Sequence, residues 1–164
     1  MLASNVCPYR GLDVETSEDE AQRLRAELVV IDEQILDPRP SMLERAELLA
    51  ARKRVYEALH PSSRHGGAPG RAGGGKIPRS DAGLISVRSH AADAAARTGL
   101  SARTVRQLVQ IAEDIPSSLL DEIRGTHLAS HQRQLLEVAR AYRDPEEQRR
   151  RVDAFLTATR IDQL

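Results

Sequence analysis

Arginine and glutamine side chains recur at helical spacing between residues 103 and 110 of this 164-residue chain. Arg103, Arg106, Gln107 and Gln110 would share one face of a helix, and no acidic residue interrupts that set. Guanidinium and carboxamide groups form two-pronged hydrogen bonds with guanine and adenine edges in the major groove. The set therefore predicts recognition of DNA bases, with Arg103, Arg106 and Gln107 as the main candidates for base contacts.

The residues before this set predict the corner that would position it. Gly99 would supply a left-handed backbone between two short helices, and Ala95 would let those helices pack closely. Ser101 would cap the second helix and, with Thr104, could also contact phosphate. The inner faces need apolar residues, which are Ala94, Leu100, Val105 and Leu108. Residues 91–110 therefore predict a helix-turn-helix, and an ordinary helical hairpin is the structural alternative.

Charge is unevenly distributed along the chain, although its formal net charge is zero. Residues 60–111 hold 8 Lys or Arg against 2 Asp or Glu, whereas the segments on either side are net negative. A basic band in a neutral chain is the electrostatic footprint of a duplex binder. Possible phosphate contacts in the Gly/Pro-rich loop 61–83 are Arg64, Arg71, Lys76 and Arg79. The alternative for these four residues is a solvated linker.

The same loop contains a partial nucleotide-binding motif. Residues 70–76 match the G-x-x-x-x-G-K half of a phosphate-binding loop. Ile77 stands where a Ser or Thr is required, and no predicted strand precedes the loop. We therefore favour a flexible basic loop over a nucleotide site.

Composition indicates a small helical protein without an active site. With no Trp, one Phe and three Tyr, the core must consist of Leu, Ile, Val and Ala. The single Cys7 leaves no internal disulfide, which fits a reducing compartment. The sequence offers no catalytic set and no group of metal ligands, so we expect neither an enzyme nor a cofactor. It also lacks a signal peptide and a membrane-spanning run, which favours a cytoplasmic, nucleoid-associated location.

Hydrophobic periodicity predicts an all-α fold in four segments. Residues 1–14 should be loosely ordered, 15–60 a helical extension of two helices, 61–83 the basic loop, and 84–164 the helix-turn-helix domain with supporting C-terminal helices. The first helix, starting near Ser17, carries an apolar stripe of Leu24, Leu28, Ile31 and Ile35. That stripe could be a homodimer seam, but packing within the chain is favoured because the repeat is short.

Capping signals and prolines predict the remaining helices. Ser41 and Glu44 form a capping box at the start of helix 41–59. The buried face of that helix would be Met42, Ala46, Leu49, Tyr56 and Leu59. Beyond the corner, the pattern predicts helices over 117–124 and 130–143 and a last helix starting at 144–145.

Segments on both sides of the predicted corner resemble one known family. The stretches LERAELLAARKRVYEALHP (43–61), HGGAPGRAGGGK (65–76), RTGLSARTVRQLVQIAEDI (97–115) and IRGTHLASHQRQLLEVA (123–139) are similar to the central part of ParB-type partition proteins. This resemblance implies sequence-specific binding of double-stranded DNA in plasmid partition or chromosome segregation. Family members usually carry an N-terminal CTP-binding domain, for which the chain has no room, so CTP-driven clamp closure is not expected. The alternative is an interaction module that pairs with a full-length partition protein through residues 18–36.

Overall fold

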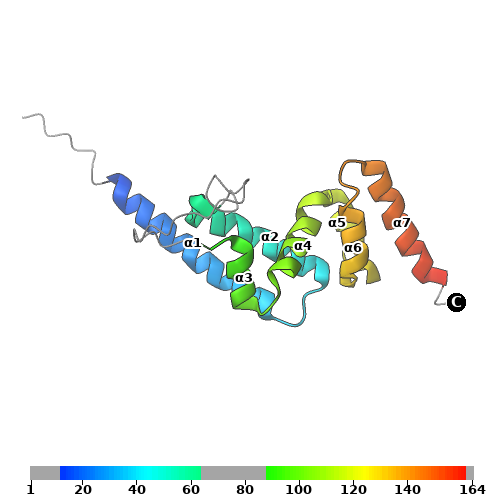
Figure 1. Ribbon diagram of the computed structural model, residues 1–164, viewed down its shortest axis with the longest axis horizontal. Helices are drawn as coiled ribbons and strands as arrows, with labels where there is room; N and C mark the ends of the chain where they lie inside the picture. The colour runs from blue at the N-terminus through cyan, green and yellow to red at the C-terminus, as the bar shows by residue number, and fades with distance from the viewer. Residues whose placement is uncertain (1–11, 64–87, 162–164) are drawn as a thin grey trace, which may run out of the picture.

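The computed structural model describes residues 12–63 and 88–161, and every regular element in these ranges is a helix. The fold is therefore all-α, as the sequence predicts. The elements are α1 (Leu12–Leu36), α2 (Met42–Leu59), η1 (Pro61–Ser63), α3 (His90–Thr98), α4 (Ala102–Asp114), α5 (Ser117–Ile123), η2 (His127–Ser130), α6 (Gln132–Ala139) and α7 (Pro145–Ile161). They form an elongated molecule, with α1 at one end and α7 at the other (Figure 1).

Helix α1 starts earlier than the sequence pattern indicates. It begins at Leu12, whereas we expected a start near Ser17 and loose order up to residue 14. No Gly or Pro occurs between Leu12 and Leu36, so no residue of this stretch interrupts the helix. The rest of the expected loose segment, residues 1–11, lies outside the described residues.

The apolar stripe of α1 packs within the chain. Ile31 is 7% exposed and Ile35 is 4% exposed, and Leu24 and Leu28 are partly buried against the same core. Their main partner is α2, which lies alongside α1 (Figure 1). Packing within the chain is therefore the arrangement observed, and the two isoleucines are not available as a dimer seam.

Helix α2 is the central element of the fold. The predicted capping box is present, because the Ser41 hydroxyl accepts from the Glu44 amide while the Glu44 carboxylate accepts from the Ser41 amide at 2.7 Å. Leu43, Ala46 and Leu49 are completely buried. Because α2 packs against both α1 and α4, the segment 15–60 shares one core with the corner. Tyr56 is buried as expected, but Met42 and Leu59 are only half-buried.

The C-terminal part contains shorter helices than predicted. The expected helix 130–143 is replaced by η2, α6 and a turn over 140–143. In that turn the amides of Ala141 and Tyr142 bond to carbonyls three residues back, which tightens the backbone before Pro145. Gln148 of α7 is 1% exposed and donates to the carbonyl of Asp114 at 2.8 Å, so it ties α7 to the end of α4.

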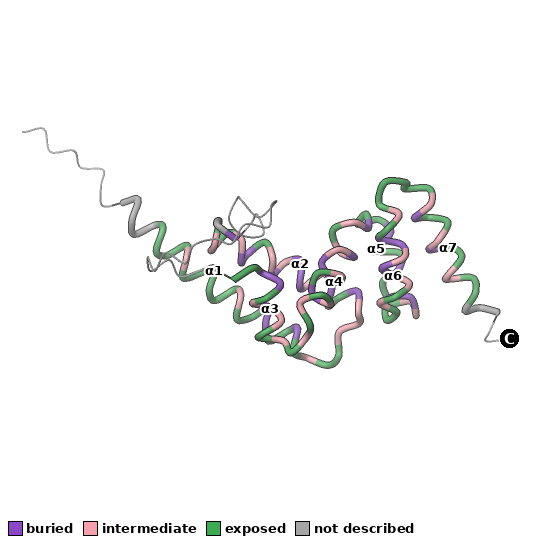
Figure 2. The backbone as a smooth tube through the Cα atoms, viewed as in Figure 1, coloured by how far each residue is buried: buried purple, intermediate pink, exposed green. Residues whose placement is uncertain are grey.

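A single cluster of buried apolar residues runs from Ile31 to Val152. Figure 2 shows buried residues following α2, α4 and α6 through the middle of the molecule. The corner formed by α3 and α4 is thus supported on one side by α2 and on the other by α6. Of the helices in the described ranges, none has the length and apolar character needed to cross a membrane.

Candidate nucleic-acid interface

The corner between α3 and α4 has the local geometry that the sequence predicts. Gly99 adopts φ 72° and ψ 1°, the left-handed conformation, and its amide donates to the carbonyl of Ala95 at 3.1 Å. Ser101 caps α4, because its hydroxyl accepts from the amide of Thr104 at 3.0 Å. Each side of the three-residue turn therefore has a hydrogen-bonded helix cap, which fixes the path of the chain.

The apolar side of the corner is buried. Ala94 and Val105 are 0% exposed and Leu108 is 1% exposed, while Ala95 and Leu100 are partly buried against the same core. Because α4 packs on α2, α3 and α6, its opposite face is held in one orientation.

The opposite face of α4, which we call the recognition face, contains Arg103, Arg106, Gln107 and Gln110. Arg103 and Arg106 are exposed, and neither makes an ion pair with any residue in the described ranges. Gln107 and Gln110 are half-buried, and the side-chain oxygen Oε1 of Gln107 accepts from the side-chain amide of Gln132 at 3.5 Å. The two arginines are thus free to contact a ligand, whereas Gln107 is already in contact with α6.

The recognition face turns acidic only at the C-terminal end of α4. Glu113 lies two turns beyond Arg106 and is neutralised by Lys53 of α2 at 2.8 Å. Asp114 is half-buried, and its carbonyl accepts the hydrogen bond from Gln148. The exposed charge at the start of α4 is therefore purely positive, which favours contact with an anionic ligand there.

A buried ion-pair network holds α3 in place, and the sequence analysis missed it. The Arg52 side chain is 0% exposed; it pairs with Asp32 of α1 at 2.5 Å and with Asp93 of α3 at 2.7 Å. Burial alone would lower the pKa of Arg52, but hydrogen bonds to the two carboxylates outweigh it and raise that pKa above its ordinary value. Arg97 lies 3.7 Å from Asp32 and 3.6 Å from Asp93, at the exposed edge. One cation thus connects three helices next to the corner.

His90, at the start of α3, is a buried side chain beside this network. It is 7% exposed, and its ring meets that of Tyr56 edge-on at 5.9 Å. Burial, followed by the charges of Arg52 and Lys53, lowers the pKa of His90 from 6.5 to about 4. The Tyr56 hydroxyl donates to the carbonyl of Arg88 at 2.8 Å and so fixes the entry into α3. His90 is therefore uncharged at neutral pH and part of the support behind α3.

The chain has two further groups of basic residues. The possible phosphate contacts Arg64, Arg71, Lys76 and Arg79 lie outside the described residues, as does the partial nucleotide-binding motif. The arginine run 149–151 of α7 lies within the described part, and each member pairs with an acid. The pairs are Arg149 with Glu122 and Asp153, and Arg150 and Arg151 with Glu147. This run is therefore a neutralised surface.

Comparison of the chain with protein-family models, with curated proteins and with solved structures gave no match. The resemblance to partition proteins consequently rests on the sequence segments quoted above.

Proposed function

We propose that the chain binds double-stranded DNA in a sequence-specific manner, with the start of α4 in the major groove. In helix-turn-helix proteins the second helix inserts its N-terminal residues among the base edges while the first helix crosses the backbone. Arg103 and Arg106 occupy the matching positions here. Their exposure without an acidic partner is the observation that carries the proposal.

The support for α4 fits this role. A recognition helix must present its side chains in a fixed orientation, because two-pronged hydrogen bonds to bases depend on geometry. The capped corner and the core beneath Val105 and Leu108 provide that rigidity. On this proposal Ser101 and Thr104, whose hydroxyls lie 2.8 Å apart at the start of α4, contact a phosphate beside the groove.

The sequence segments further suggest a role in DNA partition. On this proposal the chain is a DNA-binding unit like that of ParB-type proteins. Its role is to bind DNA, and it catalyses no reaction. The competing interaction module would use residues 18–36. In the structure Ile31 and Ile35 of that segment lie in the chain's own core, so only the outer side of α1 would remain for a partner.

Selection from a random duplex pool tests the proposal. The purified chain should retain duplexes that share a common sequence, and binding to a selected duplex should fall steeply with salt. Four phosphate contacts would lower the affinity about a hundredfold for a fourfold rise in salt concentration. A flat salt dependence, or retained duplexes with no shared sequence, would contradict sequence-specific DNA binding.

A further inference from the structure

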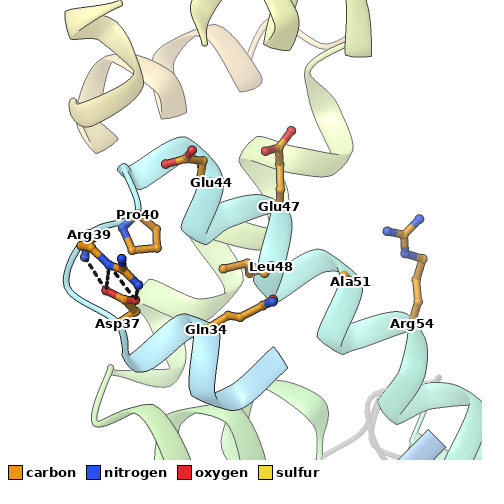
Figure 3. Close-up of a pocket in the computed structure, with 9 residues that line it drawn as sticks. All are labelled: Gln34, Asp37, Arg39, Pro40, Glu44, Glu47, Leu48, Ala51 and Arg54. Carbon is orange, nitrogen blue, oxygen red and sulfur yellow. Dashed lines mark hydrogen bonds and ion pairs between the residues drawn. The ribbon is translucent and has the colours of Figure 1, made fainter. Parts of the chain in front are cut away.

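The outward side of α2 forms a groove with the end of α1, and this groove plays no part in the proposed DNA contact. It has a volume of about 690 Å³ and is lined by Gln34, Asp37, Arg39, Pro40, Glu44, Glu47, Leu48, Ala51 and Arg54. Figure 3 shows Gln34 of α1 beside Leu48 of α2, with Glu44, Glu47 and Arg54 projecting from the same side of α2. Val30, one turn before Gln34, is 52% exposed. The groove thus has a small apolar floor with charged residues at its edges.

The charges along α2 are ordered by sign. Glu44 and Glu47 lie toward the N-terminal end of the groove, and Arg54 lies toward the C-terminal end. Residues 47 and 54 are two helical turns apart, which corresponds to about 10 Å on one face. Leu48 and Ala51, both half-buried, lie between them. Within the described ranges Arg54 has no ion-pair partner, whereas Arg39, the other arginine of the groove, pairs with Asp37.

This order makes the surface complementary to itself. We propose that a second copy of the chain docks here, with the two α2 helices antiparallel about a two-fold axis near Leu48 and Ala51. The axis places Glu44 and Glu47 of each copy across from Arg54 of the other, and the small Ala51 lets the helices approach closely. A two-fold interface requires that a patch match its own inverted copy, and acids at one end with a base at the other satisfy this.

Two acids of the groove, Asp37 and Glu47, already have partners within the chain. Asp37 pairs with Arg39, and Glu47 pairs with Arg124 at 2.8 Å at the groove's edge. Glu47 can accept a second cation because a carboxylate has four acceptor positions. The dimer follows from this surface alone; its use in reading two half-sites would rest on the proposed DNA binding.

Sedimentation equilibrium of the full chain without DNA tests the dimer. We expect a reversible monomer–dimer equilibrium that Arg54→Glu weakens about tenfold, since two symmetry-related attractions become repulsions. Glu47→Arg should weaken it similarly. An equal mixture of the Arg54→Glu and Glu47→Arg chains should restore association, because a mixed dimer regains both pairs. Arg140→Glu, which reverses an exposed charge on the C-terminal part, is the matched control and should change nothing.

Three results would overturn the proposal. A chain that stays monomeric up to high micromolar concentration has no such interface. Equal effects of Arg54→Glu and Arg140→Glu would place any dimer contact elsewhere, and failure of the mixed chains to associate would exclude the antiparallel pairing. Circular dichroism melting checks that Glu47→Arg, which also loses the Arg124 contact, remains folded. The measurement uses no DNA, so its outcome is independent of the proposed function.

Discussion

Replacing Arg52 by Met should destabilise the protein more than any other single charge removal in the described part. Met keeps much of the aliphatic volume but leaves Asp32 and Asp93 without their central cation. Removing one partner of a buried ion pair typically costs about 3–5 kcal/mol. The Asp93 side chain is 23% exposed, and Arg97 remains near both acids. We therefore expect a loss near the lower limit, about 3 kcal/mol in the free energy of unfolding.

Urea unfolding followed by circular dichroism measures this loss. The midpoint should fall while the slope stays constant, since the surface exposed on unfolding is unchanged. Arg25→Met is the control, because Arg25 of the neighbouring helix α1 is exposed and makes no ion pair with any residue in the described ranges. It should cost less than about 0.5 kcal/mol. Adding Asp32→Asn to the Arg52→Met variant should recover part of the stability by removing an uncompensated charge.

The reasoning would be refuted if Arg52→Met cost no more than Arg25→Met. Such a result would mean that the network does not hold α3 against α1 and α2. A further loss on adding Asp32→Asn would show that the destabilisation comes from lost packing and not from an unpaired carboxylate.

Three further changes probe the corner and its support. The pKa of His90 is lowered from 6.5 to about 4 in the folded chain. Between these two pH values the His90 ring is therefore protonated in the unfolded chain but neutral in the folded chain. The free energy of unfolding should therefore drop by up to about 3 kcal/mol between pH 6.5 and 4, and His90→Gln should flatten this slope in urea titrations at each pH. Gly99→Ala should cost about 1 kcal/mol by thermal unfolding, because φ is 72° although a Cβ would meet no atom within 4 Å. Ser101→Ala should cost about 1 kcal/mol, whereas Ser101→Asp should keep the cap and the stability. A pH-independent stability, or Gly99→Ala and Ser101→Ala variants as stable as the parent chain, would contradict these assignments.

Features set by neighbouring residues were predictable from the sequence. The left-handed Gly99, the Ser101 cap and the Ser41–Glu44 capping box each depend on a few consecutive residues, and all are confirmed. The apolar stripe of α1 could be predicted as well, because its spacing alone identifies the buried side.

Features that join distant segments were not predictable in the same way. Asp32 lies 20 residues before Arg52 and Asp93 lies 41 residues after it, so no local pattern identifies that arginine as buried. The contact between Gln107 and Gln132 likewise depends on how α6 meets α4. The short α6 was missed because propensity supports a longer helix, whereas the turn bonds before Pro145 end it.

The central claim, that α4 reads DNA bases, is tested most directly with a duplex selected from the random pool. The ratio of affinities for that duplex and for one of scrambled sequence should be measured for the parent chain and for Arg106→Ala. Arg25→Ala, an exposed arginine of α1, serves as the control. The account predicts that Arg106→Ala lowers this ratio by a factor that corresponds to about 1–3 kcal/mol of binding free energy. Arg25→Ala should leave the ratio unchanged. A uniform loss on both duplexes would make Arg106 a phosphate contact, and an unchanged affinity for both would contradict the claim.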